Sequence, residues 1–231
     1  MVRAQKLGPL DRVATSSRIA DQLREAVMSG ILPQGSQVGE VVLAAQLGVS
    51  RGPLREAMQR LVQEGLLRSV PHRGIFVVEL TDADVRDIYD ARQAIESAAM
   101  LAIMRRADVA KATRRLDTAV TRMAAAAERG DAAALGRGDL AFHELLLALS
   151  GSARLQRLAS TLLVVTRMCL AALTDTYVGP ARLVDEHSEI VAVIRSGDTS
   201  RALAILDEHM RDAVGRLTPV ADSAEDSAVR A

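Results

Sequence analysis

Three histidines and one aspartate stand at positions where their side chains could bind a metal ion. His143, His187 and His209 each lie among apolar residues at helical spacing, and Asp139 precedes His143 by four residues. Residues four apart share one face of a helix, so Asp139 and His143 are expected to face inward together. A buried carboxylate without a partner costs on the order of several kcal/mol, so Asp139 needs a cation nearby. Three neutral imidazoles and one carboxylate suit a divalent transition ion such as Zn²⁺, Ni²⁺ or Mn²⁺.

The alternative is that these histidines are ordinary core residues. A histidine on an apolar stripe is more often hydrogen-bonded within the core than bound to a metal. Three of them on three expected helices, with an aspartate beside one, favour a shared site. The distances between the helices do not follow from spacing, so both interpretations stay open at this point.

A second group of functional residues lies at the start of a short amphipathic helix. Helices are predicted over Val41–Leu47 and Pro53–Leu66, joined by Gly48-Val49-Ser50-Arg51. Gly48 can end the first helix in a left-handed conformation, Ser50 is a good N-cap, and Pro53 fits the first turn of the second helix. This arrangement is typical of a helix-turn-helix.

The second of these helices has apolar and basic sides. Its apolar residues recur at helical spacing and are Leu54, Ala57, Met58, Leu61 and Val62. Ser50, Arg51 and Arg55 would meet base edges and phosphates if this were a recognition helix. The alternative is a helical hairpin with a solvated arginine face.

A basic hairpin is predicted directly after this helix. The β-prone runs Leu66–Val70 and Ile75–Val78 flank Pro71-His72-Arg73-Gly74, whose Pro and Gly favour a turn. We interpret this hairpin as a wing, in which Arg73 and Gly74 would touch the DNA backbone or minor groove.

These motifs together resemble a known family. The stretch LAAQLGVSRGPLREAMQRLVQEGLL followed by PHRGIFV is similar to the winged helix-turn-helix of the GntR family of bacterial transcription regulators, over residues 15–78. The resemblance implies that the partner is double-stranded operator DNA. Because one recognition helix contacts few base pairs, we expect a homodimer on a palindromic operator.

The rest of the chain is predicted to be helical. Helices are expected over 82–106, 108–129, 132–149, 153–173, 180–196 and 199–217. The predicted fold is therefore mainly α, with an N-terminal winged helix-turn-helix (1–79) and a C-terminal antiparallel bundle of about six helices (80–217). Residues 218–231 are expected to form a disordered tail.

A second resemblance covers roughly residues 82–215. DADVRDIYDARQAIE, GRGDLAFHELLLALSG and the later EHSEI and EHM segments resemble the all-helical effector-binding (FCD) domain of FadR-type GntR regulators. That group often binds a metal through one Asp and three His, which implies Asp139, His143, His187 and His209 as ligands. It also implies a small organic acid as the effector.

Arg92 interrupts the inward stripe of the first bundle helix, which we predict from Val85, Ile88, Tyr89, Ile95 and Ala99. Pairing with Glu96 on a helix surface is one interpretation. The other, which the resemblance favours, is a guanidinium that binds the effector's carboxylate bidentately.

Composition excludes some classes of function. The 231 residues are 49% hydrophobic and 25% charged, with 2% aromatics and no Trp, which disfavours a base-stacking surface for single-stranded nucleic acid. Residues 1–78 carry ten Lys and Arg against six Asp and Glu, and the remainder carries 19 against 23.

The single cysteine, Cys169, cannot form an internal disulfide. No apolar run is long enough for a membrane span, so we expect a cytoplasmic protein without membrane contact.

The sequence therefore predicts a transcription regulator, expected to be a repressor, whose operator affinity depends on a small carboxylate bound near a divalent metal. The alternative is a metal-dependent enzyme that acts on a small organic acid and carries a DNA-binding appendage, since a His₃Asp site could activate water. A third interpretation is a metal that only stabilises the bundle. Turnover of a small acid, as opposed to binding alone, would distinguish the enzyme from the regulator.

Overall fold

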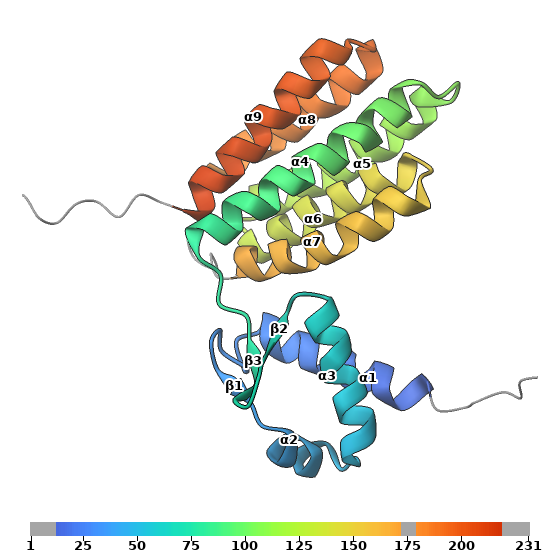
Figure 1. Cartoon of the computed structure of the whole chain (residues 1–231). Coiled ribbons are helices and arrows are strands. Elements are labelled where there is room, and N and C mark those ends of the chain that lie inside the picture. The colour runs from blue at the N-terminus through green and yellow to red at the C-terminus, as the bar shows by residue number, and fades with distance from the viewer. Residues whose placement is uncertain (1–12, 172–178, 219–231) are drawn as a thin grey trace, which may run out of the picture. The chain divides into compact units, whose positions relative to one another are not determined.

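The structure, a computed structural model, describes residues 13–171 and 179–218 (Figure 1). Contacts divide the chain into two compact units, Met1–Glu79 and Leu80–Ala231. A disordered tail was predicted over 218–231. Thr218 is instead buried and is the C-cap residue of the last helix, so the prediction was wrong for that residue. The remainder of the predicted tail lies outside the described residues.

The first unit is a winged helix-turn-helix, as predicted. Its elements are α1 (Val13–Met28), β1 (Gln37–Val38), α2 (Glu40–Leu47), α3 (Arg51–Gln63), β2 (Leu67–Val70) and β3 (Gly74–Val77). The predicted hairpin is β2 and β3, and β1 pairs with β3 to make a three-stranded antiparallel sheet in the order β1-β3-β2. Helix α1 packs against α3 and completes the core of this unit.

The turn between α2 and α3 has the predicted backbone. Gly48 ends α2 in the left-handed conformation at φ 62°, and Ser50 occupies the N-cap position of α3, although its side chain makes no capping hydrogen bond. Helix α3 therefore begins at Arg51, two residues before the predicted start. It ends at Gln63, earlier than predicted, because Gly65 takes a left-handed conformation (φ 76°) that turns the chain toward β2.

The second unit is a helical bundle. Its elements are α4 (Asp82–Met104), α5 (Val109–Glu128), α6 (Ala132–Leu149), α7 (Ala153–Ala171), α8 (Pro180–Ser196) and α9 (Thr199–Leu217). The bounds lie within two residues of the predicted ones. Thr81 and Asp84 form the capping box that begins α4, with the Thr81 side chain accepting from the Asp84 backbone N–H and the Asp84 carboxylate accepting from the Thr81 N–H.

Helix α4 is central in this bundle and packs against each of α5 to α9 (Figure 1). Most of its inward stripe is apolar and includes Met100 and Ile103. The predicted stripe was wrong at one position, because Glu96 is fully buried whereas Ile95 is only partly buried. Helix α4 thus carries two charged side chains, Arg92 and Glu96, into the interior of the bundle.

No helix among the described residues is long and apolar enough to cross a lipid bilayer.

Candidate functional site

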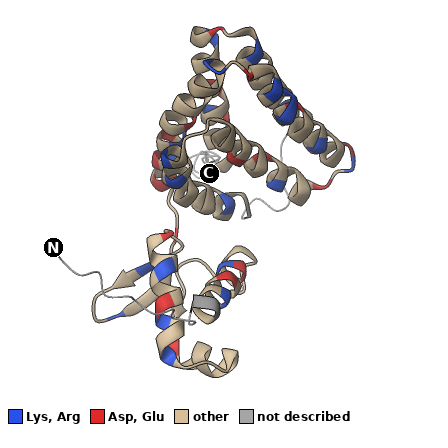
Figure 2. Ribbon diagram, turned by 90° about the vertical axis from the view of Figure 1, so that its right-hand side faces the viewer, with Lys and Arg blue, Asp and Glu red and all other residues tan. Residues whose placement is uncertain are grey.

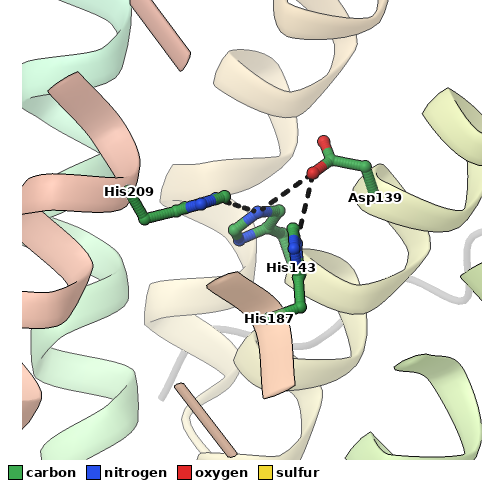
Figure 3. Close-up of side chains that lie close together, drawn as sticks. All are labelled: Asp139, His143, His187 and His209. Carbon is green, nitrogen blue, oxygen red and sulfur yellow. Dashed lines mark hydrogen bonds and ion pairs between the residues drawn. The ribbon is translucent and has the colours of Figure 1, made fainter. Parts of the chain in front are cut away.

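The structure brings the four predicted metal ligands together inside the bundle (Figure 3). Asp139 and His143 lie one turn apart on α6, His187 comes from α8, and His209 comes from α9. One ligand atom from each residue lies within 4.8 Å of the others, and all four residues are buried. The cluster therefore joins three helices that are distant in sequence.

Each histidine of the cluster is oriented by an acceptor at Nδ1. The distances are 2.5 Å from His143 Nδ1 to Glu96 Oε2, 2.9 Å from His209 Nδ1 to Glu186 Oε2, and 2.8 Å from His187 Nδ1 to the Leu183 carbonyl oxygen. A carbonyl or carboxylate oxygen only accepts, so Nδ1 of each ring carries the hydrogen. In the neutral imidazole the other nitrogen, Nε2, then presents a lone pair.

Both carboxylates that accept from these rings are ionised. Burial by itself would raise the pKa of Glu96, but the charge of Arg92 and the hydrogen bonds from His143 and Arg92 lower that pKa to about 2. Burial also opposes ionisation of Glu186, yet hydrogen bonds from His209 and Arg216 lower its pKa to about 2. Neither carboxylate can therefore donate a hydrogen to a ring nitrogen near neutral pH.

The consequence is a convergence of lone pairs. His143 Nε2 lies 3.2 Å from His209 Nε2, and His187 Nε2 lies 3.2 Å from Asp139 Oδ1. Within the described residues, His187 Nε2 makes no hydrogen bond although it is fully buried. Acceptors at such distances repel one another unless a proton or a metal cation lies among them.

The protonation states also suit a metal. The pKa of Asp139 is lowered: burial opposes its ionisation, but a proton on His187 Nε2 and positive charge on the rings, which a metal cation would replace, favour it. Burial lowers the pKa of His209 to about 4, although Glu186 opposes that shift. A neutral imidazole and an ionised carboxylate are the forms that bind metals. The four residues thus fit a divalent transition metal, with second-sphere acceptors already in place.

Arg92 lies beside this cluster with part of its guanidinium unpaired. Its Nε donates to Glu96 Oε1 at 2.9 Å, and its guanidinium carbon lies 4.7 Å from the Tyr89 ring centroid. Only 1% of Arg92 is exposed, and its Nη2 has no hydrogen-bond partner among the described residues. The two interpretations of Arg92 are therefore compatible: it pairs with Glu96, in the interior and not on a surface, and still has a donor free for a ligand.

Two residues of this site, Glu96 and Glu186, were missed by the sequence reasoning. Glu96 entered only as a surface partner of Arg92, although its place four residues after Arg92 put it on the same inward face. Glu186 precedes His187 in sequence but contacts His209 on the next helix. No local signal indicates such a contact, because it depends on how α8 packs against α9.

The expected DNA-contacting residues are all exposed on the first unit. Ser50, Arg51 and Arg55 lie at the start of α3, and Arg55 Nε is 2.7 Å from Glu40 Oε2 on α2. Both units carry basic and acidic residues (Figure 2), so the small basic surplus of the first unit does not by itself define a binding face. An assignment to DNA contact must rest on these individual side chains.

The wing has a defined conformation at its tip. The Gln37 side chain donates from Nε2 to the Arg73 carbonyl oxygen at 2.7 Å. Gly74 has φ 107°, and a Cβ at this position would lie 2.9 Å from Gln37 Nε2, so glycine is required here. The guanidiniums of Arg68 and Arg73 lie 5.4 and 5.9 Å from the Phe76 ring centroid. The exposed cations of the wing are thus held near one aromatic ring.

Comparison with known proteins agrees with both halves of this architecture. The family model for bacterial regulatory proteins of the gntR family matches residues 15–77, and the FCD domain model matches residues 87–212. An HTH-type transcriptional regulator from the ttuE–ttuC′ intergenic region of Agrobacterium vitis is 37% identical over 143 residues, which is 60% of this chain and 84% of the relative.

Two further relatives extend along most of the chain. The gluconate operon transcriptional repressor of Bacillus licheniformis is 27% identical over 213 residues, covering 90% of this chain and 87% of the relative. The crystal structure of a GntR regulator from Rhodococcus sp. RHA1 superposes with a TM-score of 0.71 at 26% identity, covering 87% of this chain and 96% of that one.

Proposed function

Because the chain belongs to the GntR family of bacterial regulatory proteins and carries its FCD domain, we propose that it is a repressor whose operator binding is controlled by a small carboxylate bound beside a divalent metal. Members of this family bind operator DNA, and the full-length relatives are named as transcriptional repressors. The first unit (1–79) would bind the operator, and the bundle (80–217) would bind metal and effector and form the homodimer.

The observation that carries this proposal is the convergence of four buried acceptor atoms from Asp139, His143, His187 and His209. Each ring is already fixed in the tautomer that presents Nε2 to the centre. A metal bound there would supply a Lewis-acidic position for a carboxylate oxygen, since four protein ligands leave positions open on a five- or six-coordinate ion.

Arg92 supports a carboxylate as the second ligand. Its free Nη2 is a buried cationic donor, and a buried donor without a partner is costly, so an anionic acceptor there would be strongly favoured. Glu96 fixes the orientation of the guanidinium through Nε. Two relatives are named as gluconate operon transcriptional repressors, so gluconate is the first acid to test.

DNA contact would come from Ser50, Arg51 and Arg55 on the recognition helix and its turn, and from Arg73 and Gly74 at the wing. The effector can change operator affinity only through its different affinities for the DNA-competent and DNA-incompetent dimers. The junction of the two units, at Glu79 and Leu80, is where such a difference would be transmitted.

Calorimetry on metal-loaded protein tests the effector part of the proposal. Gluconate and a panel of other small carboxylates would be titrated into wild type, Arg92→Met and Arg86→Met; Arg86 is an exposed arginine of the same helix and serves as the matched control. We expect an acid that binds wild type and R86M equally and R92M at least about tenfold more weakly. Equal binding to all three proteins would exclude Arg92 as the anion-binding group.

No feature of the site favours the alternative of a metal-dependent enzyme. Glu144, which directly follows His143 in sequence, is exposed and so is directed away from the buried cluster. The family and the relatives are DNA-binding regulators. The acid that binds in calorimetry should therefore be recovered chemically unchanged after prolonged incubation with the metal-loaded protein.

A further inference from the structure

Two of the cluster's histidines are attached to arginines through a glutamate. The first chain is Arg92 to Glu96 to His143, with distances of 2.9 Å at Glu96 Oε1 and 2.5 Å at Glu96 Oε2. The second is Arg216 to Glu186 to His209, in which Arg216 donates to both oxygens of Glu186. Each glutamate therefore divides its negative charge between an arginine and a ring that faces the centre.

The two chains differ in their surroundings. Arg92 and Glu96 are 1% and 0% exposed, and each Glu96 oxygen has one strong partner. Glu186 is 15% exposed at its side chain and lines a groove of about 180 Å³, where Arg182 also lies 3.3 Å from its Oε1. Charges interact more strongly when water is excluded, so the fully buried chain transmits a change in charge further than the partly buried one.

From this contrast we propose that Glu96 is a positioning residue that couples Arg92 to the metal-binding strength of His143. The proposal rests on the proposed function and deepens it. An acceptor at Nδ1 makes the opposite ring nitrogen a stronger donor to a metal. Arg92 draws negative charge toward Glu96 Oε1 and so leaves less on Oε2, the atom that accepts from His143 Nδ1. His143 Nε2 then becomes a weaker metal ligand.

The chain gives the site a specific regulatory property. An anion that engages the Arg92 guanidinium reduces its pull on Glu96, which strengthens His143 as a ligand. Anion binding and metal binding therefore favour each other through one side chain, and by linkage the effect is equal in both directions. The coupling needs no movement of α4 relative to α6, because Glu96 touches both partners already.

A double-mutant cycle on metal affinity tests the coupling of Arg92 to His143 through Glu96 without any effector. The proteins are wild type, Arg92→Met, Glu96→Gln and the double variant, all full-length, and the probe is Co²⁺ or Zn²⁺ alone in competition with a chromophoric chelator. The glutamine keeps the shape of Glu96 and removes its charge. We expect E96Q to weaken metal binding by about 10- to 100-fold. R92M should tighten it by about fivefold or more in wild type and have little effect in the E96Q background.

The cycle distinguishes coupling through Glu96 from direct electrostatic repulsion between Arg92 and the metal. Direct repulsion would make R92M tighten binding equally with Glu96 or with Gln at position 96, and that result would overturn the proposal. The cycle of Arg216→Met and Glu186→Gln is the matched control, and its coupling should be smaller because that chain is only partly buried. Coupling of equal size in the two cycles would also contradict the assigned role of burial.

Two further measurements keep the result decisive. Arg92→Gln, which is also uncharged, replaces R92M in the cycle if R92M does not give a cooperative thermal transition. The Co²⁺ absorption spectrum should show an altered ligand field at His143 in E96Q and a shift of the opposite sign in R92M. If wild type binds no metal, the proposed function fails. If wild type binds metal and the buried cycle is additive, only the role of Glu96 fails.

Discussion

Removing the metal should lower the melting temperature of the bundle by an amount that follows from the cluster's position. Its ligands come from α6, α8 and α9, so a bound ion joins three helices in the folded state and no comparable site exists in the unfolded chain. At a free metal concentration about 100 times the dissociation constant, such binding stabilises the folded state by about 2.7 kcal/mol. For a unit of this size that corresponds to a shift of about 5–11 °C.

Differential scanning calorimetry with added metal and then with excess chelator measures this shift. Every ligand of the cluster belongs to the unit Leu80–Ala231, so only the transition of that unit should move. His187→Gln, which keeps much of the side-chain volume, should melt at one temperature under both conditions. The matched control is His72→Gln, which removes the exposed histidine of the wing and should retain the full metal-dependent shift.

Two outcomes would refute this reasoning. Equal melting temperatures for wild type in metal and in chelator would mean that the cluster is only a polar part of the core. A metal-dependent shift that persists in H187Q would mean that the ion binds elsewhere in the chain.

Other predictions concern DNA binding and packing. Arg51→Ala and Arg55→Ala should each weaken binding to an operator fragment by about 1–3 kcal/mol in a gel shift at fixed salt, with unchanged melting temperature; wild-type affinity in either variant would exclude that residue from the interface. Phe76→Leu should weaken operator binding by about 0.5–1 kcal/mol because the two wing guanidiniums lose their cation–π contact, and an unchanged affinity and salt dependence would show that the ring does not position them. Gly138→Ala should destabilise the bundle by about 1–3 kcal/mol, since its Cβ would lie 2.8 Å from a side-chain atom of α5. Gly136→Ala meets nothing within 4 Å and should stabilise the same helix by about 0.4–1 kcal/mol, so urea unfolding of the pair must give opposite signs.

The elements of the fold were predictable because their signals are local. Gly48 with its positive φ, the N-cap position of Ser50, and the capping box of Thr81 and Asp84 all act within a few residues of the chain. Helical periodicity likewise predicted which face of α3 and α6 is buried. The bounds were wrong mainly at α3, where Gly65 ends the helix before the apolar periodicity ends.

The site was predictable in its inward-facing residues but not in its contacts. Periodicity placed His143, His187 and His209 on inward faces, but the 3.2 Å approach of His143 to His209 depends on how α6 and α9 pack. The contacts of Glu96 and Glu186 were unpredictable for the same reason, since each accepts from a histidine ring on another helix. Contacts of this kind are non-local, and no spacing within one helix specifies them.

The central claim is that an acid acts on operator binding through the metal centre, and an operator titration in the presence of the acid tests it most directly. An operator fragment selected from a random duplex pool would be titrated with wild type and with Asp139→Asn, each with and without the acid identified by calorimetry. The proposed function predicts a change in operator affinity of about 10- to 100-fold on adding the acid to metal-loaded wild type, equivalent to about 1.4–2.7 kcal/mol of coupling. It predicts no change for D139N or for wild type in chelator, with basal DNA binding retained. The same acid response in the metal-free protein would contradict it.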